Sequence, residues 1–144
     1  MAAIVSTIEI DRPPDEVFAY ATDPARFPEW QADVIRVEVD GHDVGSRFTT
    51  VRRIGRANRD MVQEITENQP PRRWAARGVG GPIRPNASVA VEPLDGGQRS
   101  RVTFGLDFDG RGMAELLVPV VRRMAAKGAP ISHQRLKDLL EKGA

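Results

Sequence analysis

The sequence lacks cysteine altogether. Disulfides, thiolate nucleophiles and cysteine-based metal sites are therefore excluded. Histidine is nearly as scarce, because His42 and His133 are the two histidines of a 144-residue chain and lie far apart in it. They form no histidine-built metal motif, so we expect neither a metal nor any other cofactor.

The chain also lacks an excess of charge of either sign and lacks long apolar runs. Lys and Arg total 21 and Asp and Glu total 20, so the formal net charge is +1, which gives no overall attraction to nucleic acid or anionic lipid. The most apolar uninterrupted stretch, residues 116–121, is far shorter than the roughly 20 residues of a membrane span. Residues 1–10 have neither the basic start nor the apolar core of a secretory signal. We expect a cytoplasmic protein that neither spans a membrane nor binds nucleic acid.

The first third of the sequence predicts one strand and two short helices. Residues 4–10 alternate in polarity, which is typical of a strand. Pro13-Pro14 then predicts the start of a helix, because the backbone N–H that proline lacks would have no hydrogen-bond partner in a first helical turn. Asp15 and Glu16 follow near the positive end of the helix dipole, where acidic residues are favoured. Asp23-Pro24 repeats this pattern, and Pro28 limits the second helix to about one turn.

From residue 33 to residue 108 the hydrophobic period is two. The clearest alternation is that of Val102, Phe104, Leu106 and Phe108 against polar or small neighbours. Glycine- and proline-rich turns separate six such segments, and residues 78–82 are interpreted as a flexible connection between two of them. Strands joined by short turns are antiparallel. With the first strand they predict a seven-stranded antiparallel sheet.

Residues 112–141 predict one long C-terminal helix. Met113, Leu116, Leu117, Val120 and Met124 follow the spacing of a single helical stripe, and this stripe is expected to face the sheet. A bend is expected at Pro119, which removes a backbone hydrogen bond, and a bend or brief interruption near residues 128–130. This helix is the one element large enough to cover a face of the sheet.

Several segments resemble a known family. They are Ile10-Asp-Arg-Pro-Pro-Asp-Glu-Val-Phe18, Asp23-Pro-Ala-Arg-Phe-Pro-Glu-Trp30, Gly45-Ser-Arg-Phe48, Glu64-Ile-Thr-Glu-Asn-Gln-Pro-Pro71 and Leu136-Lys-Asp-Leu-Leu-Glu141. With the order of elements, they make the chain similar to START-like and birch-pollen-allergen-like proteins, and among these to the polyketide cyclase/dehydrase and lipid-transport group of small bacterial proteins.

The resemblance implies an α+β helix-grip fold. In that fold a curved seven-stranded antiparallel sheet wraps around a long C-terminal helix, with two short helices between strands 1 and 2. It covers nearly the whole chain, so we expect one domain over residues 1–144. The family encloses a cavity between sheet and helix, and its members bind sterols, lipids, polyketides, hormones and other apolar molecules. Some members are cyclases or dehydratases.

Large apolar residues at inward positions are the candidates for lining this cavity. A dry apolar cavity favours an apolar guest, and methionines at its edges allow repacking around different guests. The alternative for each residue is that it simply fills the core. The candidate ligand-binding residues are Trp30, Phe48, Met61, Trp74, Val89, Phe104, Met113, Leu117 and Met124.

Five polar residues are candidates for placing a polar group in the cavity: Thr50, Arg52, Gln63, Arg77 and Asn86. A cyclase or dehydratase needs an acid–base pair within reach of its substrate, and no pair is defined by spacing, so we assign no catalytic residue. His42 and His133 have no carboxylate partner at helical or hairpin spacing and are predicted to be surface histidines.

Three hypotheses for function follow. The first is an intracellular binding or carrier protein for a small apolar molecule, such as a lipid, polyketide or aromatic compound, acting as a monomer or homodimer. The second is a cyclase or dehydratase that uses the same cavity. The third is an accessory module whose basic residues 52, 53, 56 and 59 meet an anionic partner, although such a cluster is more typical of a sheet edge that charge protects from aggregation.

Overall fold

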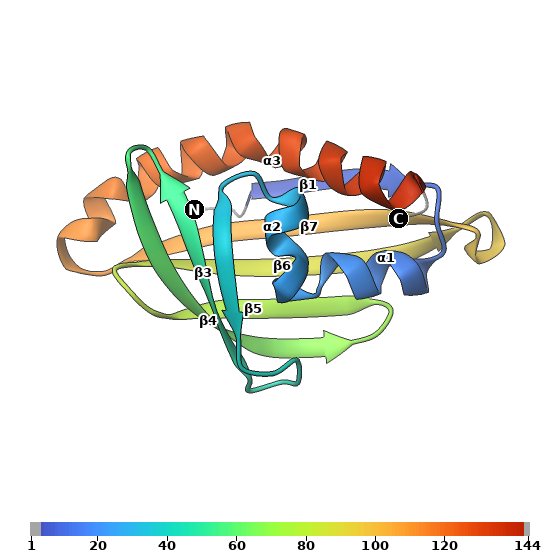
Figure 1. The fold of residues 1–144 in the computed structure, drawn as a ribbon, viewed down its shortest axis with the longest axis horizontal. Helices are drawn as coiled ribbons and strands as arrows, with labels where there is room; N and C mark the ends of the chain where they lie inside the picture. Colours follow the sequence, from blue (N-terminus) through green and yellow to red (C-terminus); the bar gives the residue numbers. More distant parts are fainter. Residues whose placement is uncertain (1–3, 143–144) are drawn as a thin grey trace.

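The computed structural model describes residues 4–142. Figure 1 shows a curved sheet with a long helix lying across it and two short helices in front of the strands, below the long helix. The elements in chain order are β1 (Ile4–Ile10), α1 (Pro14–Ala21), η1 (Pro24–Arg26), α2 (Phe27–Trp30), β2 (Val34–Val39), β3 (Arg47–Ile54), β4 (Ala57–Gln69), β5 (Arg73–Gly80), β6 (Ile83–Leu94), η2 (Asp95–Gly97), β7 (Arg99–Gly110), η3 (Gly112–Leu117) and α3 (Val118–Glu141).

The seven strands form one antiparallel sheet in the order β1-β7-β6-β5-β4-β3-β2. Strands β2 to β7 follow one another along the chain, and β1 joins the sheet at the free edge of β7. Register shifts interrupt the β4–β5 and β2–β3 pairings, and such bulges bend and twist a sheet. The predicted helix-grip architecture is confirmed, although β5 extends through residues 78–80, where a flexible connection was expected.

The two short helices form where the sequence predicts them. Pro14 opens α1, whose Val17, Phe18 and Ala21 are buried. The Asp23 carboxylate accepts a hydrogen bond from the Ala25 backbone N–H at 3.1 Å and so caps η1, satisfying one of the free donors of a helix start.

The long helix begins later than predicted, because residues 112–117 form the 3-10 turn η3 and α3 starts at Val118. Pro119 therefore occupies the first turn of α3, where a missing N–H costs no hydrogen bond, and the bend predicted at this residue was wrong. The helix then runs without interruption through Pro130 to Glu141. Gly110 makes the tight turn into η3 possible, since a Cβ there would lie 2.5 Å from Glu115 Cα.

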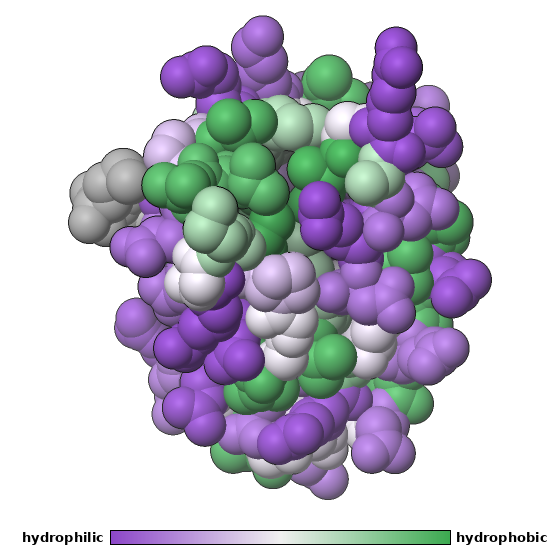
Figure 2. All heavy atoms as spheres, turned by 90° about the vertical axis from the view of Figure 1, so that its left-hand side faces the viewer, coloured by the Kyte–Doolittle hydropathy of each residue, from purple (hydrophilic) through white to green (hydrophobic). Residues whose placement is uncertain are grey.

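The start of this segment turns a different face to the sheet than the one predicted. Ala114, Val118 and Val121 are buried, and they belong to a cluster that includes Ile83 and Phe108. All five residues of the predicted stripe, by contrast, are exposed. Figure 2 looks at this end of the molecule and shows hydrophobic side chains gathered in its upper part. Residues 113–121 are apolar on both faces, and the small Ala and Val side chains allow the closer approach to the sheet.

The apolar interior consists of two clusters rather than one. The larger joins α1, α2, the inner face of the sheet and the end of α3, where Leu136 and Leu140 are buried. The smaller lies at the start of α3 around Met61, Ile83 and Phe108. This division leaves space between the clusters.

Candidate functional site

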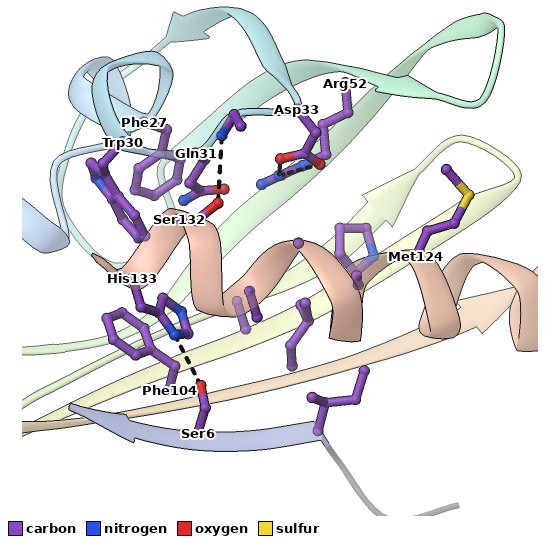
Figure 3. Close-up of a pocket in the computed structure, with 18 of the residues that line it drawn as sticks. Ser6, Phe27, Trp30, Gln31, Asp33, Arg52, Phe104, Met124, Ser132 and His133 are labelled. Atoms are coloured by element: carbon purple, nitrogen blue, oxygen red, sulfur yellow. Dashed lines mark hydrogen bonds and ion pairs between the residues drawn. The ribbon is translucent and has the colours of Figure 1, made fainter. Parts of the chain in front are cut away.

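A cavity of about 250 Å³ lies between the sheet and the middle of α3. Its lining draws on both apolar clusters, on β1, on α2 and on the loop that follows α2 (Figure 3). The cavity is larger than the engineered apolar cavity of about 150 Å³ that holds a benzene. It is therefore large enough for a small organic molecule.

Six of the nine predicted ligand-binding residues line this cavity: Trp30, Met61, Trp74, Val89, Phe104 and Met124. They come from α2, from four strands of the sheet and from α3. For the four residues on strands, alternation explains why their side chains face inward, because residues two apart point to the same face. Their part in binding a ligand stays a prediction.

The other three predicted residues are not among those that line the cavity. Phe48 is fully buried beside it, with its ring centroid 5.9 Å from that of Phe27 and 6.0 Å from that of Trp74. Met113 and Leu117 are exposed, because η3 turns its other face to the sheet. We therefore place Phe48 in the solid core and the other two on the surface.

His133 is not a surface histidine, and this prediction was wrong. Its imidazole is buried and lies parallel to the Phe104 ring, with centroids 3.9 Å apart and an angle of 13° between the planes. Its Nδ1 lies 3.1 Å from Ser6 Oγ on β1, so the two groups share a hydrogen bond (Figure 3). The partner stands 127 positions away in the sequence, so no local spacing indicates the pair.

Burial lowers the pKa of His133 from 6.5 to about 4. At neutral pH the ring is therefore uncharged, with one nitrogen as a donor and the other as an acceptor. Ser6 engages Nδ1, and no described residue between 4 and 142 forms a hydrogen bond with Nε2. Because His133 lines the cavity, this second nitrogen is available to a polar group of a ligand.

This burial predicts a specific pH dependence of stability. In the unfolded chain the histidine pKa is about 6.5, so as the pH falls from 6.5 toward 4 the unfolded state takes up a proton that the native state does not, and stability decreases. Going from about pH 7 to pH 4 lowers the free energy of unfolding of both proteins. We expect this decrease to be about 2 to 3 kcal/mol smaller for His133→Phe than for the unsubstituted protein. Urea unfolding at both pH values measures this difference. His42→Gln, at an exposed histidine, is the control, and an equal loss in His133→Phe and the unsubstituted protein would contradict the prediction.

An ion pair lies where the cavity opens to solvent. Both carboxylate oxygens of Asp33 accept hydrogen bonds from Arg52 Nη1, at 3.2 and 3.1 Å (Figure 3). Next to Asp33, the Ala32 N–H donates to Ser132 Oγ on α3 at 3.4 Å, which ties this loop to the helix. The lining residues Asp33, Arg53, Met124 and Ile131 are solvent-exposed, and we call them the mouth of the cavity.

The remaining polar candidates are distributed differently. Gln63 is buried, lines the cavity and donates from Nε2 to the Pro85 carbonyl at 3.4 Å. Thr50 is also buried, but it is not among the lining residues. Arg77 is exposed and pairs with Glu64, whereas Asn86 Oδ1 accepts a hydrogen bond from the Gly78 N–H. Only Arg52 and Gln63 of the five predicted polar residues therefore face the cavity.

Two properties of the described chain bear on the chemistry of the site. Residues 4–142 contain no group of three or more His, Asp or Glu side chains arranged to hold a metal ion. Within the same range, no helix combines the length and hydropathy that crossing a bilayer requires.

Sheet, gripped helix and lined cavity together define a protein of the START-like helix-grip class. Over residues 1–141 the chain matches the family described as polyketide cyclase/dehydrase and lipid transport, and it belongs to this family. The resemblance found in the sequence is thereby confirmed. No curated protein matches the sequence.

Solved structures share this fold at low sequence identity. A START superfamily protein from Mycobacterium smegmatis is 12% identical, with a TM-score of 0.80 and full coverage of both chains. A protein from Thermus thermophilus is 17% identical, with a TM-score of 0.79 over 99% of each chain. The di-domain ARO/CYC BexL from the BE-7585A biosynthetic pathway is 16% identical, with a TM-score of 0.74 over 98% of this chain and 47% of that one. At these identities the likeness shows the fold alone.

Proposed function

We propose that the protein binds a small, mostly apolar molecule with at least one polar group in this cavity and carries it within the cytoplasm. The observation that supports this most directly is a cavity of about 250 Å³ lined by aromatic rings and by the imidazole of His133. Each Å² of apolar ligand surface removed from water contributes about 25 cal/mol before the costs of association. The family, with its description of lipid transport, supports the same function.

The polar groups of the lining support an expectation about the chemistry of the ligand. A neutral imidazole with a free nitrogen suits a hydroxyl or carbonyl group, because such a group replaces the water that the nitrogen would otherwise bind. The guanidinium of Arg52 at the mouth is already paired with Asp33. We therefore expect a ligand with an apolar body and an uncharged oxygen function near His133.

Ligand binding is tested directly by the two tryptophans of the site. Trp30 and Trp74 both line the cavity, and they are the two tryptophans of the chain, so a ligand that enters changes the intrinsic fluorescence. We expect saturable changes with members of a panel of fatty acids, polyketide-like phenols and hydroxylated aromatics. Native mass spectrometry of the purified protein tests for a retained molecule. A panel without any saturable response, together with a protein free of bound molecules, would overturn the proposal.

A substitution at His133 tests the polar recognition. His133→Phe keeps a flat ring on Phe104 and removes both nitrogens. Ligands with a hydroxyl or carbonyl group are expected to bind about five- to tenfold more weakly to it, which is the usual net contribution of one hydrogen bond. Their deoxygenated analogues should bind to both proteins equally. Ser6→Ala, which removes the hydroxyl group that bonds with Nδ1 of His133, is the matched variant. If His133→Phe bound the oxygen-containing ligands and their deoxygenated analogues equally more weakly, this would contradict a polar role of His133.

A second candidate function is that of a cyclase or dehydratase acting on a ligand in the same cavity. It rests on the family, on the likeness to BexL and on the presence of a buried imidazole in the lining. General acid–base catalysis is most effective with a pKa near the operating pH, and a pKa of about 4 makes His133 a weak base. The carrier function is therefore the favoured one. Recovery of a bound ligand with its mass reduced by one water, by the unsubstituted protein and not by His133→Gln, would establish the enzyme instead.

A further inference from the structure

An apolar stripe on the surface is left without a partner in the fold. It consists of Met113, Leu116, Leu117, Val120 and Met124, which are 81%, 71%, 43%, 51% and 39% exposed. They follow helical spacing along η3 and the first turns of α3. A contiguous exposed apolar surface of this kind marks an interaction site. In Figure 2 it corresponds to the hydrophobic area on the end of the molecule where α3 begins.

The apolar stripe is continuous with the mouth of the cavity. Met124 belongs to both, since it is exposed on α3 and also lines the cavity. Ile131, two turns further along the helix, likewise lines the cavity and is 63% exposed. A surface that covers the stripe therefore lies directly beside the entrance through which a ligand must pass.

The segment that carries the apolar stripe has more basic than acidic residues. From residue 111 to residue 135 the chain has five basic residues and one acidic residue, Glu115. Arg122 pairs with Asp107, whereas Arg123 and Lys127 have no ion-pair partner among residues 4–142 and are exposed. Arg53, in the mouth, and Arg56 at the tip of the β3–β4 hairpin, are exposed cations as well.

We propose that this end of the protein docks on the surface of an anionic lipid bilayer. The apolar stripe enters the boundary between headgroups and acyl chains, as the apolar face of an interfacial helix does. The cations beside it meet the anionic headgroups. In this orientation the mouth faces the bilayer, so an apolar ligand passes between membrane and cavity without crossing water.

Charge favours a membrane over a second copy of the chain as the occupant. In a two-fold symmetric dimer the same patch lies on both sides of the interface. Both sides of such an interface would then carry the same excess of basic over acidic residues, and like charges across an interface are unfavourable. An anionic surface complements both the apolar and the basic component. The local distribution of charge matters here, because the net charge of +1 gives no indication of it.

Sedimentation with vesicles tests the proposal. The purified full-length protein is mixed at low salt with vesicles of phosphatidylcholine alone or of phosphatidylcholine with phosphatidylglycerol. We expect binding to the anionic vesicles, at least about tenfold weaker binding to the neutral ones, and release by salt because surface charges are screened. A protein that stays in the supernatant with both kinds of vesicle at low salt would overturn the proposal.

Two pairs of variants separate the apolar and the electrostatic components. Leu116→Gln/Val120→Gln is expected to bind anionic vesicles at least about tenfold more weakly, since two apolar side chains no longer leave water. Arg123→Gln/Lys127→Gln is expected to bind about twentyfold more weakly, from roughly a fivefold loss per basic residue near an anionic surface.

Matched controls use exposed residues away from the apolar stripe. Val44→Gln, at an exposed valine of the β2–β3 turn, should bind like the unsubstituted protein. Arg36→Gln/Arg72→Gln removes the same net charge from exposed positions on other elements, and its affinity should fall by less than that of Arg123→Gln/Lys127→Gln.

Three results would overturn membrane docking. The first is that Leu116→Gln/Val120→Gln binds vesicles as tightly as the unsubstituted protein. The second is that Arg36→Gln/Arg72→Gln loses as much affinity as Arg123→Gln/Lys127→Gln. The third is a dimer in analytical ultracentrifugation that Leu116→Gln/Val120→Gln converts to a monomer. The last result would assign the surface to a second copy. Vesicle binding is measured without a cavity ligand, so its failure leaves the proposed ligand binding intact.

Discussion

Ala87→Phe is expected to weaken ligand binding at least a hundredfold while the protein stays folded. Ala87 lies on the inner face of β6 and lines the cavity, and its partial exposure sets it apart from the fully buried core residues on the same face. A phenyl ring there occupies the space that the ligand needs. The loss follows because a ligand that cannot enter forfeits its whole apolar contact area, and a hundredfold loss corresponds to about 2.7 kcal/mol.

The control for this substitution lies on the same strand. Ala90, three residues further along β6, points to the opposite face of the sheet. Ala90→Phe adds the same ring outside the cavity and should leave ligand affinity within about twofold. Affinity is measured by tryptophan fluorescence, and circular dichroism with thermal unfolding verifies the fold of both variants. If Ala87→Phe binds ligand as tightly as Ala90→Phe does, the ligand does not occupy this cavity.

A second large effect is expected on stability from a pair of leucines in the C-terminal segment. Leu136 is fully buried in the larger apolar cluster, whereas Leu116 in the apolar stripe is 71% exposed. Leu136→Ala should lower the free energy of unfolding by about 2 to 5 kcal/mol, through lost burial and the cavity left behind. Leu116→Ala removes the same atoms from the surface and should change it by less than about 0.5 kcal/mol.

Urea unfolding monitored by circular dichroism compares these two leucine variants. The comparison also distinguishes the face of the segment that the structure buries from the face that the sequence pattern predicts. Similar losses for both variants would contradict the orientation of η3 and the start of α3 described above.

The elements that the sequence predicts well are those with a local cause. The strand pattern of Val102, Phe104 and Phe108 and the capping signal at Asp23 both act within a few residues. Four of the predicted lining residues, Met61, Trp74, Val89 and Phe104, followed from the strand pattern, because alternation along a strand fixes which side chains face inward. The resemblance to a known family supplied the remaining information, namely that the long helix stands away from part of the sheet.

The features that the sequence does not predict depend on contacts between distant segments. His133 is buried because it stacks on Phe104 of β7 and bonds with Ser6 of β1, and no pattern around residue 133 indicates either contact. The orientation of η3 was not predicted for a different reason. Its segment is apolar on two faces, and the choice between them depends on which face fits against Phe108 and Ile83, a matter of shape rather than periodicity.

The pairing of β1 with β7 has a consequence for how the chain reaches its native state. Ile4 lies opposite Leu106 in the register, so β1 has no neighbouring strand until the chain has been synthesised as far as β7. Closing so long a loop is entropically costly, and contacts of such separation slow folding. The β2–β7 meander can assemble from successive hairpins, with β1 and the gripped helix added last. Until then the aromatic interior is exposed to water, and the incompletely folded chain is expected to be prone to aggregation.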